Sequence, residues 1–301
     1  MFGLTILGNN SAIPAFDRHP TAQALTFADH VFLIDCGEGT QMQIVKYKIR
    51  GSRINHIFIS HLHGDHYFGL IGLITSMGLS GRTVPLNIYG PEALEQVIHI
   101  HLRVAATNLP FPIHFFPHPD SFTRIVDDEK MEVWCFPVQH RIPCYGFVFR
   151  EKKLPRKINA GAAKLYQVPF SFYANLQQGE DYISSDGDTI VNELLTHKNS
   201  EGRSYAFSAD TIYDTNLCQY FEEVDMLYHE STYMKQDEMF ATQRFHSTSE
   251  QAANIALKAG AKRLLIGHFS SRYEDLTDML GEATCVFENT ELALEGVTYV
   301  L

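Results

Sequence analysis

The segment that most constrains this chain is a short apolar run that leads directly into a dense group of potential metal ligands. Residues 56–60 read HIFIS, the pattern of a buried β-strand, and residues 61–66 read HLHGDH. Histidine and aspartate are the usual ligands of hydrolytic zinc, and Gly64 lets such a turn fold tightly. A lone histidine is more often structural. Three imidazoles and a carboxylate at this spacing favour a metal site, formed by His61, His63, Asp65 and His66.

Three further candidate ligands stand after other apolar runs. His140 follows MEVWCFPVQ, Asp210 follows YAFSA, and His268 follows RLLIG. Loops at the carboxyl ends of core strands are where α/β proteins build their sites. Each residue alone is more simply a solvated loop side chain. Together with HLHGDH they complete the ligand shells of two adjacent metal ions, for which zinc is the expected element and manganese or iron the alternatives.

The order of the expected elements indicates an α/β (α+β) chain. Strands are expected over 4–7, 24–35 (two strands around a turn), 56–60, 86–89, 131–138, 205–210, 224–232 and 263–270. Helices are expected over 39–49, after Pro91, and over 248–259. Ser247 and Glu250 have the spacing of a capping box at the start of the last helix, and Gly260 suits its end.

The pattern fails between about 150 and 190, where proline, glycine, aromatic residues and an initial basic stretch are mixed without period. We expect a single domain over 1–301 with residues 151–188 inserted as a projecting arm. Its basic side chains are candidates for binding nucleic acid: Lys152, Lys153, Arg156 and Lys157.

Composition excludes several classes of protein. The net charge of −11 argues against attraction of nucleic acid to the whole surface, so an RNA site would have to be local. Five scattered cysteines, none spaced as CxxC, suggest neither a disulfide framework nor a thiolate zinc site. Because the chain shows no signal-like start and no long apolar stretch, we expect a cytoplasmic protein without a membrane span.

The sequence resembles the metallo-β-lactamase superfamily, whose HxHxDH signature it matches, and more closely its ribonuclease Z family. The family-specific stretches span nearly the whole chain: DCGEGTQ (35–41), SHLHGDH (60–66), FSADT (207–211), HEST (229–232), HSTSEQAA (246–253) and GHFSSRY (267–273). The resemblance implies a four-layer αββα sandwich, two zinc ions at one edge, an arm that clamps tRNA, and a homodimer. It implies an endoribonuclease that removes the 3′ trailer from precursor tRNA.

The resemblance also implies a role for individual residues. It assigns His61, His63 and His140 to one metal, Asp65, His66 and His268 to the other, and Asp210 to a bridge. Asp65 would orient or deprotonate the attacking water. His246, oriented by Glu230, would protonate the leaving 3′ oxygen. Arg272, with Ser270 beside it, would contact phosphate through its fork of donors.

Two segments depart from the family pattern. The N-terminal loop of the form PxKxRN reads Pro14-Ala15-Phe16-Asp17-Arg18-His19, which leaves discrimination against CCA-bearing precursors open. The arm lacks the usual glycine-proline tip and lysine pair. It carries Phe170, Phe172 and Tyr173 instead, which could stack on bases or form the small core of the arm.

Two other functions remain open at this point. A small-molecule phosphodiesterase, or another hydrolase of the same fold, would share all seven ligands. An RNA-binding protein that does not cut is a second alternative, although a complete set of ligands disfavours it.

Overall fold

The computed structural model describes residues 2–199 and 202–301, which divide into two compact units. The large unit comprises residues 1–126, 133–149 and 204–301, and the small unit comprises residues 127–132 and 150–203. The segment expected as an arm, 151–188, lies within the small unit, which continues to Arg203 and includes a turn from another part of the chain.

Two seven-stranded sheets form the middle of the large unit. The first has the order β18 (Thr298–Val300), β1 (Phe2–Gly8), β2 (Ala22–Phe27), β3 (His30–Ile34), β4 (Ile54–Phe58), β5 (Leu86–Gly90), β6 (Ile113–Pro117). The second has the order β17 (Thr290–Leu292), β16 (Leu264–Gly267), β15 (Met226–Glu230), β14 (Ser204–Phe207), β9 (Cys144–Glu151), β8 (Met131–Val138), β7 (Thr123–Asp127).

Aromatic side chains fill the space between the two sheets. Phe32 and Phe58 of the first sheet pack against Phe149 and Phe147 of the second, with ring centroids 5.8 and 5.4 Å apart. All four are fully buried. Large rigid rings bury much apolar surface and so stabilise the packing of one sheet on the other.

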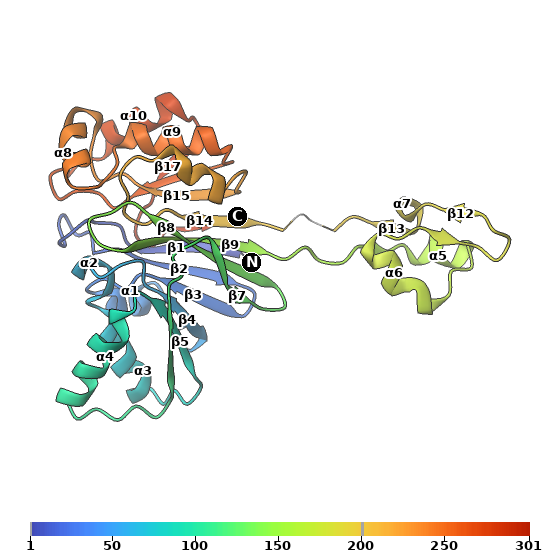
Figure 1. Ribbon diagram of the computed structural model, residues 1–301, viewed down its shortest axis with the longest axis horizontal. Helices are drawn as coiled ribbons and strands as arrows, with labels where there is room; N and C mark the ends of the chain where they lie inside the picture. Colours follow the sequence, from blue (N-terminus) through green and yellow to red (C-terminus); the bar gives the residue numbers. More distant parts are fainter. Residues whose placement is uncertain (1, 200–201) are drawn as a thin grey trace. The chain divides into compact units, whose positions relative to one another are not determined.

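Helices cover the outer face of each sheet, which confirms the four-layer αββα architecture (Figure 1). The first sheet carries α1 (Thr40–Lys46), η1 (Gly51–Arg53), α2 (Gly64–Tyr67), α3 (Leu70–Leu79) and α4 (Ala93–Val104). The second carries η3 (Thr215–Tyr220), η4 (Lys235–Asp237), α8 (Glu238–Gln243), α9 (Ser249–Ala259) and α10 (Thr277–Val286).

The start of α9 corrects one expectation. Its capping box is formed by Thr248 and Gln251, one residue later than the expected Ser247 and Glu250. Ser247 is unavailable because its hydroxyl donates to the Thr211 carbonyl oxygen at 2.8 Å. Gly260 ends the helix in the left-handed conformation, as expected.

The small unit is built from short elements around a core of its own. These are β10 (Lys157–Ile158), α5 (Ala160–Leu165), η2 (Phe170–Phe172), α6 (Tyr173–Gln178), β11 (Tyr182–Ile183), β12 (Thr189–Ile190), α7 (Asn192–Leu195) and β13 (Thr196–His197). This core is a cluster of buried apolar residues: Ala163, Val168, Leu176, Ile190 and Leu195. Phe172 and Tyr173 pack against this core, whereas Phe170 is 85% exposed.

Candidate metal centre and active site

The parallel ladders of the large unit bring the expected ligands to one edge. In the second sheet β14, β15 and β16 run parallel, so Asp210, Glu230 and His268 follow or end neighbouring strands. HLHGDH follows β4 of the first sheet, and His140 follows β8. Because strand ends of both sheets meet here, residues as far apart in the sequence as His61 and His268 become neighbours.

The seven expected ligands form two groups whose donor atoms lie within 4.8 Å of one another. The first group contains His61, His63, His140 and Asp210, and the second contains Asp65, His66 and His268. Asp210 also reaches the second group, since its Oδ2 lies 3.3 Å from Nε2 of both His66 and His268. This position between the two groups is the one that a bridging carboxylate needs.

Hydrogen bonds from outside the groups fix the orientation of the imidazoles. Asp35, buried at the end of β3, accepts from the Ser60 backbone N–H at 2.7 Å and lies 2.7 Å from His66 Nδ1. The remaining nitrogen of His66 therefore points into the cluster. In the same way His268 Nδ1 lies 2.9 Å from Thr232 Oγ1. Partners of this kind set the tautomer and direction of metal-binding histidines.

His140 is held by the same device, with Nδ1 donating to the Phe245 carbonyl oxygen at 2.9 Å. Sequence reasoning missed Asp35 and Thr232 as orienting residues, although both stand in family stretches already noted. The available signal for Asp35 was a carboxylate directly after an apolar strand.

The charges of the cluster are those of a cation site. Asp35, Asp210 and Glu230 are buried and Asp65 is nearly so, and among the described residues no lysine lines the adjoining pocket. Burial raises the pKa of Asp210, but the neighbouring His268 and His66 outweigh it, so that this pKa lies well below its ordinary value. Burial lowers the pKa of His66, yet Asp210 and Asp65 raise it well above the ordinary value. The donor types, their spacing and the surplus of carboxylate fit two divalent ions.

Asp65 lies between this cluster and the adjoining pocket. Its Oδ2 accepts from the Ala12 backbone N–H at 2.7 Å and stands 3.4 Å from His268 Nε2. Burial raises its pKa, but His66 and His268 more than compensate and leave the pKa below the ordinary value. The carboxylate is therefore ionised and able to accept hydrogen bonds or bind a cation.

His246 and Glu230 form a buried ion pair beside the cluster. His246 Nδ1 lies 2.8 Å from Glu230 Oε1. Glu230 also accepts from the backbone N–H groups of Thr211 and Thr232, which fixes its position. Burial lowers the pKa of His246, but the Glu230 carboxylate outweighs it and raises the pKa to about 9. The imidazole is thus protonated at neutral pH, as a proton donor must be.

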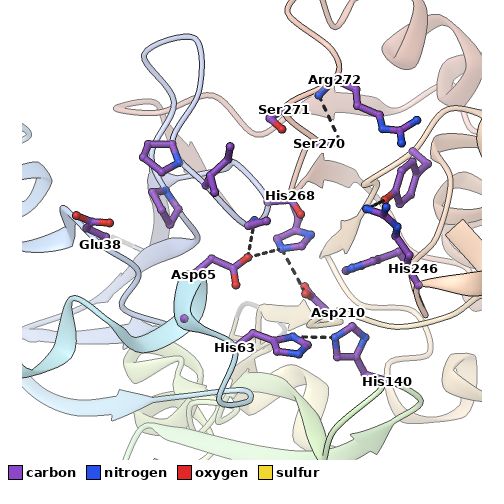
Figure 2. A pocket seen from close by; sticks show the side chains of 18 of the residues that line it. Glu38, His63, Asp65, His140, Asp210, His246, His268, Ser270, Ser271 and Arg272 are labelled. Atoms are coloured by element: carbon purple, nitrogen blue, oxygen red, sulfur yellow. Dashed lines mark hydrogen bonds and ion pairs between the residues drawn. The ribbon is translucent and has the colours of Figure 1, made fainter. Parts of the chain in front are cut away.

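A pocket of about 820 Å³ opens onto this arrangement (Figure 2). His63, Asp65, His140, Asp210, His246 and His268 reach its wall, together with Ser270 and Arg272. The Arg272 guanidinium lies over the Phe240 ring, 4.9 Å from its centroid, and its backbone N–H donates to Ser270 Oγ at 3.3 Å. The volume admits several groups of a substrate around the cluster.

The four basic residues expected to bind RNA belong to the small unit. Lys152 pairs with Asp127, and Arg156 donates from Nε to Thr196 Oγ1 at 2.6 Å. Lys153 and Lys157 are exposed. The side chains of Lys152 and Arg156 are therefore also used within the unit itself.

The N-terminal loop reaches the pocket through its first residues. Pro14 lines the pocket, whereas the Arg18 guanidinium donates to the carbonyl oxygens of Glu274 and Tyr273 and to Asn10. Phe16 is 47% exposed. In this loop Arg18 therefore holds the backbone in place.

Comparison with solved structures identifies the class of protein. The metallo-β-lactamase fold protein YhfI from Bacillus subtilis matches with a TM-score of 0.69 at 19% identity, over 99% of this chain and 98% of that one. Human tRNase Z, short form (ELAC1), matches with a TM-score of 0.72 at 27% identity, over 99% and 98%. Fold and site together define a hydrolase with the metallo-β-lactamase fold.

Sequence comparison then identifies the family. Ribonuclease Z of Bacteroides fragilis (strain YCH46) is 43% identical over 297 residues, which cover 98% of both chains. The chain belongs to the ribonuclease Z family, and its residues 2–154 also match the family model described as anti-Pycsar protein Apyc1.

Proposed function

We propose that this chain is a zinc-dependent endoribonuclease that removes the 3′ trailer from precursor tRNA. Cleavage would leave a 3′-hydroxyl on the tRNA and a 5′-phosphate on the trailer. The observation that carries the proposal is the shared position of Asp210 between two groups of metal donors, beside the His246–Glu230 pair. It stands in a chain 43% identical to a ribonuclease Z over nearly its whole length.

The residues that would hold the two ions are those of the two groups. His61, His63 and His140 would bind one ion, Asp65, His66 and His268 the other, and Asp210 both. When bound, two such ions make hydroxide available from water at neutral pH and stabilise negative charge on phosphorus. Manganese or iron would suit the same donors.

Asp65 and His246 divide the proton transfers between them. Asp65 is ionised and faces the pocket, where it would orient or deprotonate the attacking water. His246 is protonated and held by Glu230, so it donates a proton to the leaving 3′ oxygen. Arg272 and Ser270 line the same pocket and contact the phosphate that is cut.

The remaining parts of the proposal concern recognition. Lys152, Lys153, Arg156 and Lys157 of the small unit bind tRNA. The chain forms a homodimer, for which exposed apolar residues Met42, Val45 and Leu79 on α1 and α3 provide a suitable face. No helix in the described part of the chain is long and apolar enough to cross a membrane. The tRNA substrate is in keeping with a cytoplasmic location.

Two measurements on the purified chain test this function. Elemental analysis of protein never exposed to chelator should find about two metal ions per subunit, because seven ligands with one bridge complete two shells. Incubation with precursor tRNAs, with and without an encoded CCA, followed by mapping of the product ends, tests the reaction. Cleavage of small phosphodiesters without cleavage of any precursor would favour a small-molecule phosphodiesterase instead.

A further inference from the structure

Three arginines around the pocket have no acidic partner among the described residues. Arg141, Arg244 and Arg272 all line the pocket. Elsewhere in the large unit Arg53 pairs with Asp29 and Arg263 with Glu291, and the guanidinium of Arg82 is taken up by carbonyl oxygens. Within the described part of the chain, Arg141, Arg244 and Arg272 share no such partner and lie together at one pocket. Their position beside a cation site indicates an anionic ligand.

Of these three arginines, Arg141 makes the fewest contacts that stabilise the fold. Its Nη2 lies 3.0 Å from His63 Nε2, and the side chain is otherwise exposed. An imidazole carries no negative charge that could compensate a guanidinium. By contrast, Arg272 stacks on Phe240 and Arg244 donates to Tyr233 Oη at 3.3 Å.

The position of Arg141 differs from that of Arg272. Arg141 directly follows His140 and contacts His63, so it stands at the His63 and His140 end of the cluster. Arg272 lies beyond His268 at the opposite end of the cluster, as Figure 2 shows. A single phosphate bound at the centre of the cluster does not require guanidinium groups at both ends. A polynucleotide backbone, which carries a charge at every linkage, supplies an anion to each.

We propose that Arg141 binds a backbone phosphate next to the one that is cut, and so selects a polynucleotide over a small phosphodiester. This rests on the proposed endoribonuclease function and names a further substrate-binding residue for it. The fork of the guanidinium provides two parallel donors for phosphate oxygens, which a lysine cannot reproduce.

The test compares Arg141→Gln with Arg53→Gln, which removes the same charge outside the pocket. Both are made in a His246→Ala background, where slow cutting allows equilibrium binding of a fluorescent precursor tRNA to be followed across a salt series. We expect Arg141→Gln to weaken binding about tenfold, and to make the slope of log affinity against log salt shallower by about 0.7 to 0.9. Arg53→Gln should change neither. Arg141→Lys should restore the slope and only part of the affinity.

A second measurement locates the phosphate. Precursors with a single uncharged methylphosphonate, placed one or two linkages to either side of the cut, are cleaved by wild-type protein and by Arg141→Gln. At one position the penalty should be present in the wild type and absent in the variant. Equal penalties in both proteins at every position, or unchanged affinity and slope, would overturn the role of Arg141. Failure of the wild type to cut any precursor would instead overturn the proposed function.

Discussion

The two compact units of this chain differ in how firmly neighbouring residues fix their side chains. In the large unit nearly every residue of the site is held by another: Asp35 holds His66, Thr232 holds His268, and Glu230 holds His246. The small unit is built on a core cluster of five buried apolar residues and leaves Leu165, Phe170 and Ile183 largely exposed. Chemistry needs donor atoms fixed within fractions of an ångström, whereas recognition of a large substrate tolerates variation in the surface that binds it.

The largest effect is expected from Asp210→Asn in the large unit. Because Asp210 serves both groups of donors, its loss should lower metal content and reduce cleavage of precursor tRNA by about a thousandfold or more. Elemental analysis and initial rates measure both, with circular dichroism to show that the fold persists. Asp29→Asn, an exposed position outside the pocket, is the control. A variant that kept two metals and near-normal turnover would contradict the assignment.

His246→Ala should give the next largest loss. Protonation of a poor leaving group by a positioned acid contributes roughly 10²–10⁴-fold, so cleavage of RNA should fall by about that factor. Hydrolysis of an activated aryl phosphodiester, whose leaving group needs no proton, should fall far less. Glu230→Gln should also lower the rate of RNA cleavage. Equal losses on both substrates would remove His246 from the acid role.

Excision of the small unit tests directly which unit contributes to tRNA binding and which to catalysis. Glu151 donates from its backbone N–H to the Arg203 carbonyl oxygen at 2.8 Å, so residues 152–202 can be replaced by a short glycine linker between these two. If about three phosphate contacts come from this unit, the slope of log affinity for tRNA against log salt should become shallower by roughly two to three. Turnover of a small phosphodiester should change little. Unchanged affinity and slope would make the unit a structural insertion.

The smallest effect is expected from Phe170→Ala within the small unit. The ring is 85% exposed and contacts Tyr173, with centroids 4.9 Å apart, so it is available for stacking on an unpaired base. Base stacking on an aromatic side chain contributes about 1–3 kcal/mol. Affinity for precursor tRNA should therefore fall by about fivefold or more, without loss of stability. Phe172→Ala, whose ring packs on the core, should lower stability instead. The opposite pattern would exchange their roles.

Much of the site could be predicted because its residues are marked by local pattern. Each expected metal donor follows an apolar strand, and the family stretches are spread along the chain from residue 35 to residue 273. The capping residues of α9 were placed one position too early, because both Ser247 and Thr248 have the right side chain. Only the distant Thr211 carbonyl, which takes up the Ser247 hydroxyl, decides between them.

The structure of the small unit could not be predicted from the pattern of apolar and polar residues. Its helices are too short to show a period, and its basic residues look equivalent along the sequence. The structure separates them, since Lys152 pairs with Asp127 and Arg156 with Thr196, while Lys157 stays exposed. It likewise separates Phe170 from Phe172 and Tyr173.

The sequence by itself determined which residues are candidate metal donors, because each is a histidine or aspartate that stands after an apolar strand. The tertiary structure decided the geometry: that Asp210 lies between two groups of donors, that Asp35 and Glu230 are buried against His66 and His246, and that Arg141 faces the pocket without a carboxylate. These facts depend on which strand ends meet at the edge of two packed sheets. Such contacts join residues up to two hundred positions apart, and no local pattern records them.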